Sequence, residues 1–442
     1  MRTVALARLV GSEQILVMTS RGARTKQRLQ YDDPDAVAKA EKRAVLKRAP
    51  AQRLVPLFAH LPQLEPLRPD ATQVSFVETS GLHPRVVRLG QQLAHGVVQG
   101  GSARVVALLL ALREMIADFE PTNSSSTLPP ATDAAASMPV KVSDSGTESI
   151  TETRRELERA LNRHIQFLVD SRPLSIAMGN AVRFVKSRLG IQALAQSFLE
   201  LQQQIINDID AFIEERVVLA LETIFDAGAD RIRDGDVVMT YDASFLVESI
   251  LLRAVQKHKR RFRVIVLDAR PRHRGCALVH RLLQGGVAQC TYGLLQGAPM
   301  LVQEANLLLL GAEACFSNGA VLAAAGTASV ASLAKQERIP VAVACESLKF
   351  SERVLIDSIC LNELGNPDEL TWGTWMRPNA SQVGQNGGIQ PPLGEDWRER
   401  YPNLKLLHLY YDVTPAEAVD ALITEFGLIP PHGVAAVTLD MG

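Results

Sequence analysis

The second half of this chain alternates short apolar runs with segments of helical composition, and no other feature restricts the possible folds as strongly. The runs have four to six residues each, which suits strands buried on both faces better than helices. Strands that alternate with helices favour a parallel sheet, because the crossover between parallel neighbours is usually a helix. We therefore predict an α/β fold over 229–442, with strands at 237–241, 264–268, 287–292, 307–310 and 341–345.

The first half of the chain is expected to be an all-α helical domain over 54–228. Pro84 suits the first turn of a helix, and the apolar residues after it recur at helical spacing. Ser102 follows two glycines and is expected to cap a second helix over 103–119. Apolar residues at steps of three, four and seven predict one long helix over 194–225.

Three stretches lack the pattern of either domain. Residues 1–53 carry much positive charge without a wide apolar face, so we expect a basic N-terminal arm that is partly disordered. The segment 121–148 is rich in Ser, Thr, Pro and Ala, and buries too little apolar surface to offset the entropy of ordering, which predicts a disordered insertion. Residues 366–402 are rich in Gly, Pro, Asn and Trp and predict a long loop.

The end of the chain indicates a helix followed by a strand. Thr414, Pro415 and Glu417 form a capping box with proline at the first helical position, which predicts a helix as far as Gly427. The apolar run 434–439 is expected to be a closing strand of the sheet.

Composition indicates a soluble intracellular protein. Hydrophobic residues make up 47% of the 442 residues and charged residues 21%, with a net charge of −1. No apolar run approaches the roughly 20 residues that cross a bilayer. The five cysteines form no CxxC pair and have no histidine at metal-ligand spacing, which suggests reduced thiols in the cytosol. We therefore expect a cytosolic protein with no membrane contact, no direct nucleic-acid binding, no metal and no cofactor.

The first predicted strand runs into a turn at 242–244, where sheets of this kind hold a ligand or a catalytic group. A dinucleotide site needs glycines in this turn so that backbone N–H groups approach the pyrophosphate. A covalent mechanism needs a thiol or an activated hydroxyl. The turn contains neither glycine nor cysteine, so we expect the architecture of an enzyme without its chemistry.

Other polar residues follow the predicted strands and are candidates for a pocket. Arg270 can grip a phosphate through its guanidinium, or it can pair with Asp268 at the end of the second strand. Glu313 follows the fourth strand and suits either a general acid or base or a paired carboxylate. Asn318 precedes a glycine and favours a tight turn. These residues form no known phosphate-loop or catalytic-triad motif.

Four stretches resemble one known family: DARP at 268–271, GAEACFSNGAV at 311–321, GTASVASLA at 326–334 and CESLKFSERV at 345–354. The chain is similar to the initiation-factor-2B alpha/beta/delta family, which also contains methylthioribose-1-phosphate isomerase and ribose-1,5-bisphosphate isomerase. The resemblance runs from about residue 54 to the C-terminus, with interruptions at 121–148 and 366–402. It implies a helical N-terminal domain followed by a Rossmann-like parallel-sheet domain.

Within this family the chain is most similar to the delta subunits. The stretches that carry this similarity are LFAHLPQ at 57–63, HPRVVRLG at 83–90, SRPLSIAMGNAVRF at 171–184 and YYDVTPAEAVDALITEFGLIP at 410–430.

The isomerase relatives carry a catalytic cysteine in the turn after the first sheet strand and an aspartate in a GAD motif. The matching positions here are Asp242 and Glu313. The resemblance therefore implies a non-catalytic regulatory subunit of the guanine-nucleotide exchange factor for translation initiation factor 2, with exchange itself carried out by the epsilon subunit. A vestigial pocket would then be lined by Asp242, Asp268, Arg270, Glu313 and Asn318.

The resemblance also implies partners. The chain would pair with a beta subunit through its C-terminal domain, within a decamer that holds two copies each of alpha, beta, gamma, delta and epsilon subunits. Its helical domain would contact the alpha subunit of initiation factor 2, including the phosphorylated, inhibitory form made in the integrated stress response.

Candidate contact residues follow from these implied partners. Arginine side chains suit an acidic or phosphorylated partner, although Arg172 and Ser175 can equally cap a helix. For initiation factor 2 alpha we select Arg104, Arg172, Ser175, Asn180 and Lys186. For the beta subunit we select Leu406, Leu407, Leu409 and Tyr410, which can equally form a buried central strand.

Two other functions stay open at this point. The first is an active sugar-phosphate isomerase, against which Asp242 in place of cysteine argues. The second is a sensor of sugar phosphates or nucleotides that uses the pocket near Arg270, and this role is compatible with that of a scaffold.

Overall fold

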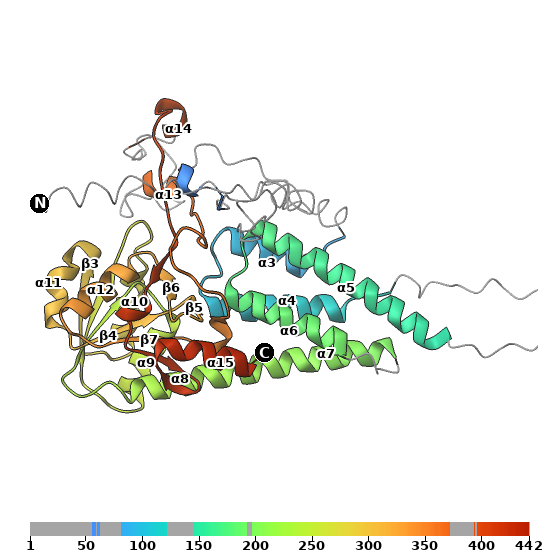
Figure 1. Ribbon diagram of the computed structural model, residues 1–442, viewed down its shortest axis with the longest axis horizontal. Coiled ribbons are helices and arrows are strands. Elements are labelled where there is room, and N and C mark those ends of the chain that lie inside the picture. Colours follow the sequence, from blue (N-terminus) through green and yellow to red (C-terminus); the bar gives the residue numbers. More distant parts are fainter. Residues whose placement is uncertain are drawn as a thin grey trace, which may run out of the picture. The chain divides into compact units, whose positions relative to one another are not determined.

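The computed structural model describes residues 55–58, 60–61, 81–121, 145–191, 197–371, 393 and 396–441 (Figure 1). Residues Arg43–Gly442 form one compact unit. No helix among the described residues is long and apolar enough to cross a membrane. The arm predicted at 1–53, most of the insertion predicted at 121–148 and most of the loop predicted at 366–402 lie outside the described residues.

Helices precede all of the described strands. Proline opens the first long helix, as predicted, whereas the second begins after Gly100, whose φ of 84° is readily adopted only by glycine. Ser102 is not the predicted cap, because its hydroxyl donates to the carboxylate of Glu346 instead. The helical elements are η1 (Pro56–Phe58), α3 (Pro84–Ala94), α4 (Gly101–Ala117), α5 (Ser145–Ser171) and α6 (Ile176–Ile191).

The long helix predicted at 194–225 is present as three consecutive segments. They are α7 (Phe198–Ile213), the π-helical turn η4 (Glu214–Leu219) and α8 (Ala220–Ala229). Helix α7 packs on α4, and α8 packs on the first helix of the sheet region. This helix therefore runs from the helical bundle to the sheet, and the π turn lies at the junction.

Apolar side chains of α3 to α7 form the core of the bundle. Leu93, Leu108, Phe167 and Ile205 are all fully buried in it. Leu93 and Ile205 lie in the helical patterns predicted from the sequence, and burial of each large apolar side chain stabilises the fold by roughly 1.5–3 kcal/mol.

The main sheet has the strand order β11-β10-β7-β4-β1-β2-β3. Every neighbouring pair is parallel except β10 with β11. The strands are β1 (Val237–Tyr241), β2 (Arg263–Asp268), β3 (Gln289–Leu294), β4 (Leu307–Gly311), β7 (Val341–Ala344), β10 (Ala421–Thr424) and β11 (Gly427–Ile429). The predicted fold class, a helical N-terminal region followed by a Rossmann-like parallel sheet, is confirmed.

Helices cover both faces of this sheet, and each face has its own apolar core (Figure 1). One core includes α8, α9 (Phe245–Gln256) and α10 (Arg274–Gln284). The other includes α11 (Ala298–Leu301) and α12 (Thr327–Gln336). Short 3-10 turns join these elements at η5 (Leu295–Gly297), η6 (Val302–Glu304) and η7 (Ser347–Lys349).

A second, smaller sheet packs beside the first and was not predicted. Its order is β8-β5-β6-β9, with β5 and β6 joined by a tight turn at Asn318 and Gly319. Its strands are β5 (Ala314–Phe316), β6 (Val321–Ala324), β8 (Phe350–Ser351) and β9 (Tyr411–Thr414). Two short helices, α13 (Asp368–Thr371) and α14 (Trp397–Arg400), lie at the two ends of the predicted loop.

The predictions for the end of the chain are wrong. The capping motif at Pro415 forms only the 3-10 turn η9 (Ala416–Ala418), after which β10 and β11 form a hairpin. Leu422 and Ile423 are buried on opposite faces of the sheet, which favours a central strand over a half-exposed helix. The predicted closing strand is the helix α15 (Val434–Met441), which follows the turn η10 (Pro431–Gly433).

Candidate functional site

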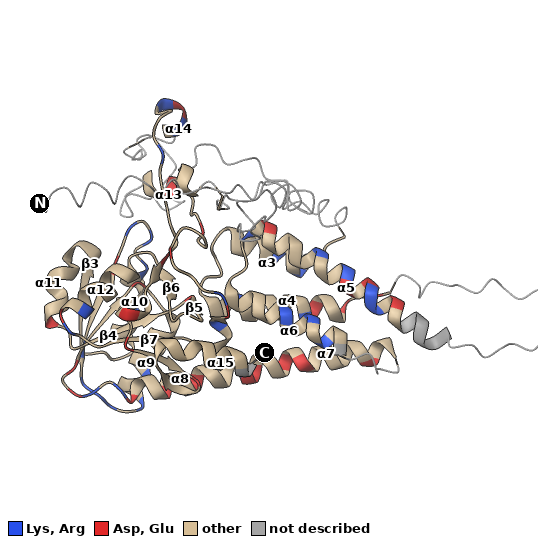
Figure 2. Ribbon diagram, in the orientation of Figure 1, with Lys and Arg blue, Asp and Glu red and all other residues tan. Residues whose placement is uncertain are grey.

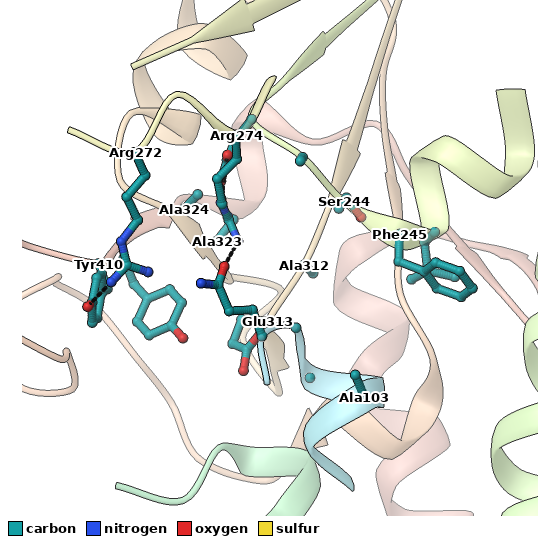
Figure 3. Close-up of a pocket in the computed structure, with 18 of the residues that line it drawn as sticks. Ala103, Ser244, Phe245, Arg272, Arg274, Ala312, Glu313, Ala323, Ala324 and Tyr410 are labelled. Carbon is teal, nitrogen blue, oxygen red and sulfur yellow. Dashed lines mark hydrogen bonds and ion pairs between the residues drawn. The ribbon is translucent and has the colours of Figure 1, made fainter. Parts of the chain in front are cut away.

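A cavity of about 680 Å³ lies between the helical bundle and the C-terminal ends of β1, β2 and β4. Parallel strands end at one edge of a sheet, so the side chains that follow them meet there. The lining includes four of the five residues predicted for a vestigial pocket, namely Asp242, Asp268, Arg270 and Glu313. Arg272 and Tyr410 lie on one side of this pocket, and Ser244 and Phe245 lie on the other (Figure 3).

Asn318, the fifth predicted pocket residue, does not line this cavity. It lies in the turn between β5 and β6, and its side-chain amide donates to the backbone oxygen of Leu355 at 2.8 Å. The prediction is wrong because this turn belongs to the second sheet, which the sequence pattern did not reveal.

Asp242 directly follows β1 and is held by Arg274, the first residue of α10. Asp242 has a left-handed backbone with φ of 60°, and its N–H donates to Leu267 O at 2.8 Å. Its carboxylate accepts two hydrogen bonds from Arg274, one from Nε to Oδ1 at 2.9 Å and one from Nη2 to Oδ2. Burial alone lowers the pKa of Arg274, but the Asp242 carboxylate raises it above its usual range. The charge of Asp242 is therefore neutralised within the chain.

Asp268 ends β2 and is almost completely buried. It accepts hydrogen bonds from the backbone N–H of Ala269 at 2.8 Å, that of Cys276 at 3.1 Å, and the Tyr292 hydroxyl at 3.1 Å. Burial raises the pKa of Asp268 despite these donors. The carboxylate thus fixes the loop between β2 and α10.

Glu313 follows β4, lines the cavity and pairs with Arg104, a buried residue of α4. Arg104 Nη1 lies 3.4 Å from Glu313 Oε1, and Nη2 donates to Pro173 O at 2.7 Å. Burial raises the pKa of Glu313, although the Arg104 guanidinium opposes that rise. Glu313 is therefore the paired carboxylate that the sequence offered as one of two roles.

Lys349 and Glu346 form a second buried pair under the start of α4. Lys349 Nζ lies 2.6 Å from Glu346 Oε2 and 3.1 Å from Ala312 O. Burial alone lowers the pKa of Lys349, whereas the Glu346 carboxylate raises it above its usual range. Ser102 donates to the other oxygen of Glu346, so this pair connects the bundle to the sheet.

Arg272 and Tyr410 form the outer wall of the cavity. The Arg272 guanidinium lies 4.3 Å from the centre of the Tyr410 ring and donates to its hydroxyl (Figure 3). It also pairs with Glu369 of α13, with 3.0 Å between Nε and Oε2. Arg270 is exposed at the rim. In the sequence this wall is marked by the basic residues 272–274, which follow DARP. Nothing in the sequence indicates that Arg272 pairs with Glu369, about a hundred positions later.

The residues predicted to contact initiation factor 2 alpha are mostly interior. Arg104 and Arg172 are 1% and 5% exposed, and Ser175 is also buried. Arg172 Nε donates to Glu363 at 2.9 Å, and the Ser175 hydroxyl accepts from the N–H of Met178 at the start of α6. These three side chains stabilise the chain itself, which contradicts their predicted role as partner contacts.

The other two predicted contact residues lie on α6. The side-chain amide of Asn180 donates to Leu348 O at 2.8 Å and to Phe350 O at 3.0 Å, so it joins the bundle to the sheet. Lys186 is exposed to solvent. Of the five residues selected, the other four make contacts inside the described part of the chain, and Lys186 alone remains a candidate for a partner contact.

The four residues predicted for the beta-subunit contact lie in different environments. Leu409 forms an antiparallel bridge with Leu364 and packs in a small apolar cluster, and Tyr410 lines the cavity. Leu406 is half-buried, whereas Leu407 is 39% exposed. They form neither one exposed surface nor the central strand offered as the alternative.

Within the described residues, no three His, Cys, Asp or Glu side chains gather in a way that could hold a metal ion. Charged residues of both signs are distributed over the bundle and the sheet region (Figure 2).

Comparison with known proteins identifies the family. The model of the initiation factor 2 subunit family matches residues 97–431. The chain belongs to the initiation factor 2 subunit family.

Two relatives are delta subunits. Translation initiation factor eIF2B subunit delta of Dictyostelium discoideum is 37% identical over 411 residues, which are 92% of this chain and 60% of that protein. The protein of the same name from Schizosaccharomyces pombe is 32% identical over 361 residues, 80% of this chain and 68% of that protein. The chain thus spans less than two thirds of the Dictyostelium relative.

One solved structure and one enzyme complete the comparison. A chain of the tetrameric eIF2B-beta2-delta2 complex from C. thermophilum has a TM-score of 0.65 and 28% identity, and the match covers 86% of this chain and all of that one. The ribose 1,5-bisphosphate isomerase of Pyrococcus furiosus is 31% identical over 286 residues, 64% of this chain and 81% of the enzyme. The predicted resemblance to the delta branch, with isomerases as further relatives, is confirmed.

Proposed function

We propose that this chain is a delta-type regulatory subunit of the guanine-nucleotide exchange factor for translation initiation factor 2, without catalytic activity of its own. The ion pair between Asp242 and Arg274 carries the proposal. It occupies the turn after β1, where the family resemblance assigns a catalytic cysteine to the isomerases. A carboxylate held by an arginine is a poor nucleophile and lacks the thiol that the isomerase mechanism uses. The resemblance to delta subunits, at 37% identity, supports the same reading.

Assembly is the main expected role. The related beta2-delta2 complex supports pairing with a beta subunit, and we propose further association with alpha, gamma and epsilon subunits in a decamer. The hairpin of β10 and β11 ends in an edge strand of the main sheet, β11, and its side chains Phe426 and Leu428 are 54% and 41% exposed. Exposed apolar side chains on a sheet edge suit a protein interface. We therefore assign the beta contact to this hairpin in place of Leu406, Leu407, Leu409 and Tyr410.

The contact with initiation factor 2 alpha is assigned to the exposed side of α6. Arg183 and Lys186 are both exposed and lie about one turn apart on this helix. Two such cations suit an acidic or phosphorylated surface, such as the inhibitory form that acts in the integrated stress response. The protein would act in the cytosol, bound neither to membranes nor directly to nucleic acid.

Affinity purification from native cytosol tests the assembly role. The tagged full chain is expected to recover the alpha, beta, gamma and epsilon subunits and initiation factor 2. The double variant Phe426→Glu with Leu428→Glu should lose the beta subunit, whereas Leu199→Glu, at a still more exposed apolar position on α7, should retain it. Recovery of none of the other subunits by the unmodified chain would overturn the proposal.

Enzymatic assay separates this role from the alternative. The purified chain is expected to turn over neither ribose 1,5-bisphosphate nor methylthioribose-1-phosphate, while the Pyrococcus furiosus isomerase serves as the positive control for the first substrate. Turnover of either compound would make the chain an isomerase and contradict the non-catalytic assignment.

A further inference from the structure

The cavity at the strand ends has one apolar wall. This wall comes from the loop before α4, from α4 itself, from the junction of η4 and α8, and from the start of α9. Leu110 is 44% exposed and Phe245 is 61% exposed, so apolar surface faces the opening as well as the interior. The residues of this wall are Val98, Val106, Ala107, Leu110, Val217, Leu221 and Phe245.

The opposite wall is polar, and four of its cations are paired with carboxylates of the same chain. In each of these four pairs a nitrogen of the cation lies 2.6 to 3.0 Å from a carboxylate oxygen. The pairs are Arg172 with Glu363 at 2.8 Å, Arg272 with Glu369 at 3.0 Å, Lys349 with Glu346 at 2.6 Å and Arg274 with Asp242 at 2.9 Å.

These pairs make the cavity unsuitable for a phosphate. An anion that approached Arg274 would compete with a bidentate carboxylate and would be repelled by Asp242. Breaking this partly buried ion pair leaves Asp242 without its charged donor, which costs roughly 1–3 kcal/mol. Neutral ligands avoid both penalties, because they need only the apolar wall and hydrogen bonds to polar groups that stay paired.

The volume also suits a small molecule. Cavities that bind ligands of drug size measure roughly 300–1,000 Å³ and are lined mainly by apolar side chains with a few polar groups. A volume of about 680 Å³ lies within that range.

We propose that this cavity binds an uncharged amphipathic small molecule, with its apolar ring system against α4 and Phe245 and its polar groups toward the paired side chains. The proposal goes beyond the regulatory function, since neither assembly nor the contact with initiation factor 2 requires a ligand here. It also differs from a sugar-phosphate site, because the ligand carries no net charge.

Two dyes with the same ring system test the charge preference. Anilinonaphthalene is neutral, and anilinonaphthalenesulfonate carries one negative charge on the same skeleton. Fluorescence titration of the full chain is expected to show saturable binding of one neutral dye per chain, at least about tenfold tighter than the sulfonate, since tenfold equals only about 1.4 kcal/mol. Ribose 5-phosphate at millimolar concentration should not displace the neutral dye.

A matched pair of substitutions locates the binding site. Ala107→Trp places a bulky side chain in the cavity, whereas Ala211→Trp introduces the same residue on the exposed face of α7. The first should weaken binding of the neutral dye at least tenfold, and the second should leave it unchanged. Equal thermal midpoints would show that both variants are folded, and Phe245→Ala supplies a second cavity variant should Ala107→Trp fail to fold.

Asp242→Asn tests the neutralisation directly. Asparagine tolerates the left-handed backbone of this position and removes the charge, so the variant should fold and leave Arg274 without its carboxylate. Affinity for the sulfonate dye is then expected to rise at least tenfold, while affinity for the neutral dye changes little. Absence of saturable neutral-dye binding, equal binding to both tryptophan variants, or tighter binding of the sulfonate by the unmodified chain would each overturn the proposal.

Discussion

Arg274 and Asp242 form a bidentate ion pair that joins the first residue of α10 to the turn after β1. The side chain of Asp242 is 15% exposed and that of Arg274 is 33% exposed, so the pair is only partly screened by solvent. Because Asp242 also has a left-handed backbone, the pair fixes the position at which two neighbouring strands end.

Arg274→Ala should therefore lower the free energy of unfolding by roughly 1–3 kcal/mol, since it leaves a half-buried carboxylate without its charged donor. Asp242→Asn should cost less, because asparagine tolerates the backbone and can still accept from Arg274. Urea denaturation of both single variants and the double variant measures the coupling, which should be roughly 0.5–3 kcal/mol. Strictly additive effects would contradict a direct interaction between the two side chains.

Arg172 and Glu363 form a more deeply buried pair, with side chains 6% and 9% exposed. Arg172→Ala should lower the free energy of unfolding by roughly 3–5 kcal/mol, because Glu363 is left buried without its nearest cation. Arg85→Ala is the matched control: the side chains of Arg85 and its partner Glu114 are 57% and 39% exposed, so the loss should stay below about 1 kcal/mol. Similar losses for the two variants, measured by urea denaturation, would show that burial of the first pair contributes little.

The sequence was most informative where one periodicity dominated. Val238 and Met239 of β1, and Leu93 of α3, lie in apolar patterns that continue over several residues, and each is buried as its pattern predicts. A capping box upstream predicted that Leu422 and Ile423 lie in a helix. They lie instead in strand β10, because a strand buries both side chains, one on each face of the sheet. Local turn chemistry is weaker than the apolar surface that a central strand buries.

The candidate site was predictable only in part, because its contacts join distant residues. Asp268 and Glu313 were found because they lie at or just beyond the ends of strands, and the ends of parallel strands meet at one edge of the sheet. Glu363 and Glu369, which neutralise Arg172 and Arg272, lie far away in the sequence, and neither was among the predicted site residues. Arg172 was expected on the surface because its sequence neighbours indicate the start of a helix, whereas the carboxylate that pairs with it in the interior, Glu363, is distant in the sequence.

Close packing between Gly311 and Ser244 gives a third prediction. A Cβ added to Gly311 at the end of β4 would collide with the Ser244 side chain at the start of α9. Gly311→Ala should therefore destabilise the protein by roughly 1–3 kcal/mol, and Ser244→Gly in the same chain should recover part of the loss. Gly179→Ala, on α6 with open space around the new atom, should leave stability unchanged or raise it by up to about 1 kcal/mol. Failure of Ser244→Gly to recover any stability would show that another contact is responsible.

Asp412 of β9 lies at the N-terminus of α12 and accepts hydrogen bonds from Gly326 N at 2.7 Å and Ala328 N at 3.0 Å. Burial nevertheless raises its pKa from 3.8 to about 6, because the backbone donors offset only part of the cost of burying the charge. Between about pH 4 and this value the folded chain therefore holds a proton that the unfolded chain has lost.

The sign of the pH dependence follows from this difference in bound protons. The contribution of Asp412 to stability is fully present below the unfolded pKa and is lost as pH rises through about 6, by at most about 3 kcal/mol. Relative to Asp412→Asn, the unmodified chain should lose stability between about pH 4.5 and about pH 6.5 in urea denaturation. Asp357→Asn is the control, since backbone donors lower the pKa of Asp357 and its stability change lies at more acidic pH. A constant difference between the unmodified chain and Asp412→Asn across this range would contradict the raised pKa, because no other residue differs between the two proteins.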